Sequence, residues 1–145
     1  MLLLKNETAS LRLDIVNYEF SEVEYGMDEY DRNWLLLRCT WTEDGEIHKD
    51  SNDCLLAQEL TELAAGLKVL AAGIKDRYDS DFIASGMTFS AWAEVDGFGA
   101  MMTFYLPNTM DGDDTAEVVS HLTAQELKEF IAELDKDCAK FPERK

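Results

Sequence analysis

The chain has 145 residues, the usual length of one domain, and its 46% hydrophobic and 30% charged residues are typical of a folded globular protein. Its 30 acidic residues against 13 basic ones give a formal net charge of -17. Such a surface repels nucleic-acid phosphates and anionic membranes and attracts basic partners. We therefore expect a single domain over 1–145 that binds neither nucleic acid nor membranes. Acidity that serves only solubility is the simpler alternative.

The sequence also favours a cytoplasmic location. Before Lys5 the only apolar run is Leu2–Leu4, which is shorter than the roughly 7–15 residues of a signal-peptide core. No apolar run approaches the roughly 20 residues that span a membrane. Cys39, Cys54 and Cys138 are odd in number and widely spaced, which indicates reduced thiols in a reducing compartment.

The N-terminal half has the alternation of half-buried strands. A short strand is expected at 2–5, and residues 10–16 alternate apolar with polar side chains, as a second strand does. Residues 34–42 alternate in the same way. Asp44-Gly45 then predicts a hairpin turn, and a polar return strand should occupy about 46–51, with a break at 51–53.

Two helices are predicted. The first, about 56–72, has Asp53 or Cys54 near its start and Gly73 at the position of a left-handed C-cap. Its apolar stripe consists of Leu56, Leu60, Leu63, Leu67 and Leu70. The second starts at Thr123 with a capping box that includes Glu126, and it ends before Pro142.

Between the helices the alternation predicts further strands at 87–95, 99–106 and 117–122, with a hairpin turn at Asp96-Gly97. The connecting segments are 74–81 and 107–115. Together these elements predict an α+β two-layer domain: a mostly antiparallel sheet of about six or seven strands with two helices on one face.

The two helices resemble each other. Residues 57–65 align with 124–132, with six identities in nine positions. An internal duplication with half-repeats 1–73 and 82–142 would explain this, and so would the common use of good helix formers in both.

No catalytic signature is present. His48 and His121 are the only histidines, and neither lies in a motif with a nucleophile. The acids from Asp111 to Asp114 fail as a calcium loop, because Ala116 occupies the position that requires glycine. We expect no catalytic residues, no metal site and no cofactor, and hence a non-enzymatic protein.

The acids gather instead in two segments without a base. Ser21–Asp31 contains five acids and two tyrosines, and Asp111–Glu117 contains four acids. Tyrosines among carboxylates suit an interface, because aromatic rings supply stiff apolar area and acids attract a basic partner. Solvated loops are the simpler alternative. The candidate partner-binding residues are Glu22, Glu24, Tyr25, Asp28, Glu29, Tyr30, Asp31, Asp111, Asp113 and Asp114.

A second candidate surface is the sheet face opposite the helices. If the helices cover one face only, Trp34, Arg38, Trp92 and Tyr105 would share the other. A large aromatic patch usually marks a contact. This alternative predicts an accessory or oligomeric domain that pairs through the sheet face.

Four short segments carry a resemblance to a known family. They are Tyr18-Glu19-Phe20, Tyr30-Asp31-Arg32-Asn33-Trp34-Leu35, Asp53-Cys54-Leu55 with Glu59-Leu60, and Phe141-Pro142-Glu143-Arg144. In these segments the chain resembles the WapI-type family of small bacterial proteins. The family takes its name from the immunity protein that neutralises the toxic domain of a wall-associated contact-dependent toxin, a nuclease acting on tRNA. The resemblance implies an immunity protein that binds a basic toxin domain directly.

Overall fold

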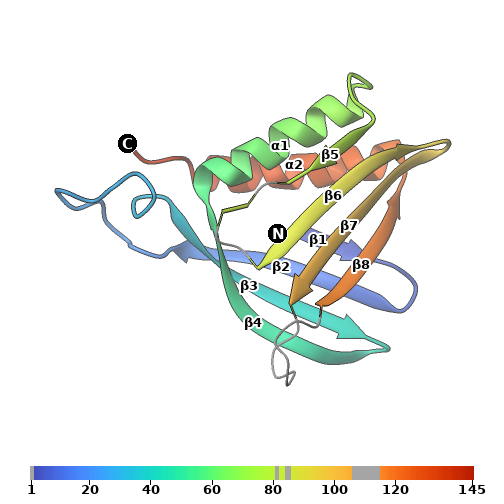
Figure 1. Cartoon of the computed structure of the whole chain (residues 1–145), viewed down its shortest axis with the longest axis horizontal. Helices are drawn as coiled ribbons and strands as arrows, with labels where there is room; N and C mark the ends of the chain where they lie inside the picture. Colours follow the sequence, from blue (N-terminus) through green and yellow to red (C-terminus); the bar gives the residue numbers. More distant parts are fainter. Residues whose placement is uncertain (1, 81, 84–85, 106–114) are drawn as a thin grey trace.

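In the computed structural model, which describes residues 2–80, 82–83, 86–105 and 115–145, two antiparallel sheets lie beneath a pair of helices (Figure 1). The first four-stranded sheet has the order β1 (Leu2–Lys5), β2 (Ala9–Tyr18), β3 (Trp34–Glu43) and β4 (Glu46–Leu56). The second has the order β5 (Arg77–Asp79), β6 (Met87–Glu94), β7 (Gly97–Tyr105) and β8 (Thr115–Leu122). A helix follows each sheet in the chain: α1 (Ala57–Ala71) and α2 (Ala124–Lys140).

The predicted α+β class, with antiparallel strands and two adjacent helices, is confirmed. The strands nevertheless divide between two sheets, whereas the sequence pattern predicts one sheet of six or seven strands. Alternation identifies the residues that share a face of a strand, but it does not say which strands pair.

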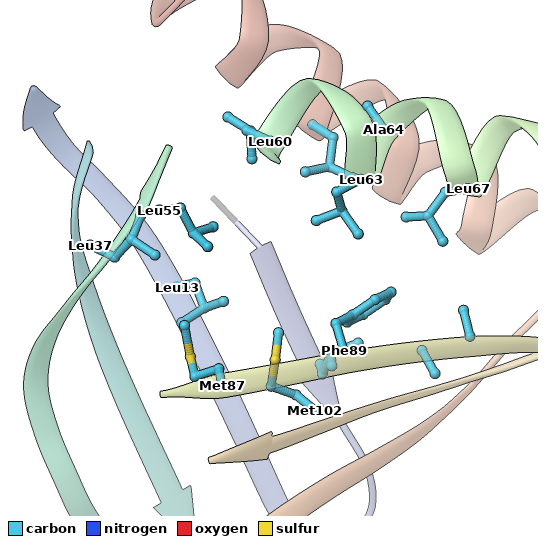
Figure 2. Packing of buried hydrophobic residues seen from close by; sticks show 14 of the residues in the cluster. Leu13, Leu37, Leu55, Leu60, Leu63, Ala64, Leu67, Met87, Phe89 and Met102 are labelled. Atoms are coloured by element: carbon cyan, nitrogen blue, oxygen red, sulfur yellow. The ribbon is translucent and has the colours of Figure 1, made fainter. Parts of the chain in front are cut away.

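The inner faces of the two sheets supply one continuous core with the helices. Figure 2 shows Leu13 and Leu37 of the first sheet facing Met87 and Met102 of the second. Across the same interface, the Trp41 and Phe104 rings meet edge to face with 5.2 Å between centroids. The helices complete the core with buried side chains that include Leu60, Leu63, Leu67, Leu127 and Leu134.

Several boundaries differ from the prediction around the first helix. The break expected at 51–53 is wrong, because β4 continues to Leu56, which pairs with Trp34. The helix therefore has Leu56 at its N-cap in place of Asp53 or Cys54. The connector predicted at 74–81 contains β5. The left-handed glycine is confirmed, since Gly73 has φ 75°.

The two helices begin at equivalent residues of the aligned segments. In each, the glutamate three residues after the N-cap accepts a hydrogen bond from the N-cap backbone N–H. Glu59 Oε1 lies 2.9 Å from Leu56 N, and Glu126 Oε1 lies 3.0 Å from Thr123 N. The strands of the second sheet begin at Arg77, five residues before the predicted start of the second half-repeat at 82. The duplication itself stays a prediction.

Glu59 is a buried carboxylate (4% exposed) with two backbone donors. Besides the Leu56 N–H, it accepts the N–H of Ile83 at 2.8 Å through Oε2. We expect Glu59→Gln to lower the free energy of unfolding by about 1–3 kcal/mol, because an amide presents one acceptor oxygen to two backbone donors. Urea denaturation measures the change. Glu62→Gln, on an exposed position of the same helix, is the control, and equal midpoints for both variants would contradict the prediction.

Candidate partner-binding site

The connection between β2 and β3, residues 19–33, projects from the body of the molecule on the side where the chain ends (Figure 1). We call residues 21–31 of this connection the acidic loop. Tyr25 is fully exposed, at 109% of its reference area, and Tyr30 is 42% exposed. Of the loop's five acids, Asp31 is half-buried and the other four are exposed: Glu22, Glu24, Asp28 and Glu29.

The acidic loop has its own hydrogen-bonded structure. Asp28 Oδ1 accepts the Asp31 N–H at 2.8 Å, which closes a short turn. Arg32 donates to the Met27 carbonyl twice, from Nε at 3.0 Å and from Nη2 at 2.8 Å. Gly26 has φ 84°, the left-handed region that favours glycine. The loop is thus a folded surface feature whose acids occupy defined positions.

The carboxylates of the acidic loop carry uncompensated charge. The two nearby arginines, Arg32 and Arg144, direct their guanidinium groups to backbone carbonyls of Met27, Phe20, Ser21 and Arg32. Among the described residues, no acid of this loop forms an ion pair with a base. The arrangement leaves the charges available to a cation from outside the chain.

A hollow of about 530 Å³ lies against the acidic loop. Its wall combines carboxylates with aromatic rings, from Glu19, Phe20, Glu22, Glu24, Tyr25 and Asp31. This combination suits a lysine or arginine side chain, whose apolar stem packs on aromatic carbons while its charged end meets carboxylates.

Only part of the second acidic segment, Asp111–Glu117, lies within the described residues. Asp111, Asp113 and Asp114 lie outside the described residues, and Glu117 is exposed on β8. The site that the structure describes is therefore the acidic loop alone.

The aromatic sheet face does not exist as one surface. Trp34 and Arg38 belong to β3 of the first sheet, whereas Trp92 and Tyr105 belong to β6 and β7 of the second. The expectation of one shared face is corrected, because it depended on a single sheet. The guanidinium group of Arg77 also lies over the Trp92 ring, with its central carbon 5.8 Å from the ring centroid.

His121 lies on the outer face of β8 with 71% of its side chain exposed. Its Nδ1 lies 2.8 Å from Glu94 Oε1, and this hydrogen bond lowers the pKa of the Glu94 carboxyl. In the part of the chain that the structure describes, no thiol or hydroxyl group is hydrogen-bonded to the imidazole. The pair is a surface hydrogen bond across the sheet.

Sequence reasoning missed Asn33, which is fully buried at the base of the acidic loop. Its Nδ2 donates to the carbonyls of Glu29, at 2.8 Å, and Arg144, at 3.1 Å. Its Oδ1 accepts the Arg144 N–H at 2.6 Å, and its carbonyl accepts the Ala57 N–H at 2.9 Å. Asn33 thereby joins the loop, the start of α1 and the end of the chain.

The segments that carried the family resemblance meet at this base. The Tyr18 hydroxyl donates to the Pro142 carbonyl at 2.5 Å, Asn33 holds Arg144, and Leu35 pairs with Leu55. The family resemblance already singles out these segments in the sequence. It does not indicate that they contact one another.

Cys54 is half-buried beside this base. Burial raises the pKa of its thiol, and the charges of Asp53, Glu19 and Glu59 raise it further. We expect the folded protein to react with a disulfide reagent more slowly at Cys54 than the urea-unfolded chain does at pH 8, because the thiolate is the nucleophile. The rate should rise as the pH passes above the ordinary thiol range. Mass spectrometry of the Cys54 peptide measures it, and equal folded and unfolded rates would contradict the prediction.

The fold and this loop define the molecule as a small acidic α+β domain with an exposed, negatively charged connection. The chain belongs to the Immunity protein WapI-like family, which matches residues 1–142. Family membership supports an immunity-type role, which in general means binding a toxin partner without catalysis.

Two other comparisons complete the description. A comparison with curated proteins finds no match. Among solved structures, the chain is similar to the plant transcriptional regulator PBF-2, with 13% identity, a TM-score of 0.49 and coverage of 98% of this chain and 87% of that one. No helix within the described residues is long and apolar enough to cross a membrane.

Proposed function

We propose that this protein is a non-enzymatic immunity protein that neutralises a basic, nuclease-type toxin domain by direct binding. One observation carries the proposal: the acidic loop presents folded, exposed carboxylates that no base of the described chain neutralises. The three cysteines are free thiols, which fits action in the cytoplasm, where thiols stay reduced.

Electrostatics supports a basic partner. Nucleases bind polyanions and so commonly present cationic surfaces. A net charge of -17 attracts such a surface at long range, and a one-signed field speeds encounter by about 10- to 1,000-fold. At short range, the carboxylates of the acidic loop can occupy the positions that phosphates would take, which blocks the nucleic acid.

The hollow at the loop suggests how the contact begins. Phe20, which is 41% exposed, and the fully exposed Tyr25 line this hollow together with acidic residues. A lysine or arginine from the toxin would be buried at its stem and paired at its head, and such anchors dominate many interfaces. The candidate residues of the described loop are Glu22, Glu24, Tyr25, Asp28, Glu29, Tyr30 and Asp31. The undescribed Asp111, Asp113 and Asp114 remain proposed contributors.

Co-expression tests the proposal. Each toxin domain encoded beside the gene is produced alone and then with this protein, and growth is measured. We expect one of the domains to arrest growth alone and to be tolerated with this protein. The purified complex should weaken between about 50 and 500 mM salt, because screening shortens the reach of exposed charges. If no neighbouring domain is toxic, or none is neutralised, the proposed function is overturned.

A further inference from the structure

The last residues of the chain fold back onto the base of the acidic loop. Phe141 is buried (6% exposed), and its ring meets Tyr18 edge to face with 5.7 Å between centroids. The Tyr18 hydroxyl donates to the Pro142 carbonyl. These contacts anchor the tail beside the point where β2 ends and the loop connection begins.

Arg144 extends from this anchor to both ends of the connection. Its Nε donates to the Arg32 carbonyl at 2.6 Å, near the start of β3. Its Nη2 and Nη1 donate to the carbonyls of Phe20 and Ser21, at 2.8 and 3.3 Å, near the end of β2. One rigid guanidinium group therefore holds together two segments that the chain itself separates by the ten residues 22–31.

Other contacts fix the orientation of this guanidinium group. Its central carbon lies 3.8 Å from the centroid of the Tyr18 ring, in cation–π geometry. The backbone of Arg144 is held in turn by the side chain of Asn33, through both its amide and its carbonyl. The planar fork of arginine suits three carbonyl acceptors at once, whereas a lysine ammonium is a compact point charge on a flexible stem.

We infer that Arg144 is a positioning residue for the acidic loop: the tail acts as a brace that keeps the loop's acids in one arrangement before a partner arrives. Because Arg144 uses backbone carbonyls, the brace adds order without neutralising the carboxylates by ion pairs. A preordered loop loses less conformational entropy on binding, which strengthens the complex. The importance of the brace for binding rests on the proposed function, whereas its effect on the loop does not.

Hydrogen exchange of the full chain tests the brace without any partner. In Arg144→Ala, we expect backbone amides of residues 19–33 to exchange about tenfold faster or more, because several charged hydrogen bonds are lost. Amides of β6, β7 and β8 should keep their rates. Arg144→Lys should restore only part of the protection. Lys145→Ala removes the same charge from an exposed neighbour and is the matched control.

A Glu-specific protease gives a second readout, because Glu22 and Glu24 lie in the loop. Cleavage at these positions should accelerate about tenfold in Arg144→Ala and stay unchanged in Lys145→Ala. Unchanged exchange and cleavage in Arg144→Ala would overturn the inference. Equally faster exchange throughout β6–β8 would also overturn it, since that would show global destabilisation.

Binding to the toxin domain found by co-expression separates the inference from the proposed function. Loosening of the loop with weaker binding supports both. Suppose that the variant without the loop acids binds more weakly, while Arg144→Ala loosens the loop but leaves binding unchanged. The role of the brace in recognition is then overturned. If neutralising the acids has no effect either, the loop's proposed role fails and the brace stands as a structural device.

Discussion

Replacing all five acids of the acidic loop with amides is expected to slow association with the toxin domain by about 10- to 1,000-fold at low salt. Under the proposed function, encounter depends on attraction between the loop's uncompensated carboxylates and a cationic partner surface. The dissociation rate should rise as well if one base of the partner is seated in the hollow. Stopped-flow or surface-based kinetics would measure both rates. The variant carries Glu22→Gln, Glu24→Gln, Asp28→Asn, Glu29→Gln and Asp31→Asn.

The matched control removes the same charge from exposed acids elsewhere on the protein. Suitable positions belong to other elements and turns: Glu7, Glu46, Glu62, Asp76 and Asp96. We expect this control to change the association rate much less, because steering is strongest for charges at the contact. Equal slowing in the two variants would show that net charge matters and the loop does not. Both variants should unfold at wild-type denaturant concentrations.

Asn33→Ala is expected to lower the free energy of unfolding by about 2–4 kcal/mol. The side chain of Asn33 makes three hydrogen bonds at a fully buried position. Its loss leaves the Glu29 and Arg144 carbonyls and the Arg144 N–H without this partner. Urea denaturation followed by tryptophan fluorescence measures the effect, and Trp34, the next residue, lies close enough to report on the site.

A second variant distinguishes hydrogen bonding from volume. Asn33→Asp keeps the size and the acceptor for the Arg144 N–H but loses both donors, so it should also be strongly destabilised. Asn17→Ala is the control, because Asn17 is exposed and, among the described residues, its side chain bonds only the adjacent Tyr18 N–H. A wild-type midpoint for Asn33→Ala would contradict the account of the loop base.

Local patterns predicted most of the secondary structure. The leucine stripe of α1, the Thr123 capping box and the alternation in β3 each depend on residues close in sequence, and all are confirmed. β5 was missed because Arg-Tyr-Asp has no apolar alternation to reveal it. The extension of β4 was missed because Ser51 to Asp53 are polar, and its pairing with β3 is a tertiary property.

The candidate site was predictable only where it depends on residues close together in the sequence. Clustered acids and tyrosines are visible in the sequence, and the structure places those of the acidic loop on the surface. The residues that hold the loop were not recognisable, because Asn33 and Arg144 are 111 positions apart and each has an ordinary sequence context. Only folding brings their hydrogen-bonding groups together.

The position of the acidic loop within its sheet has a consequence for specificity. It joins the second and third strands of the first sheet, and the corresponding connection in the second sheet is the short turn at Val95 and Asp96. The sheet therefore does not require a long connection there. Tyr18, Asn33 and Arg144 hold the ends of the loop. We therefore expect the residues between these ends to tolerate exchange without loss of the fold. Under the proposed function, we expect a different loop grafted onto this base to give a protein of the same fold that binds another partner.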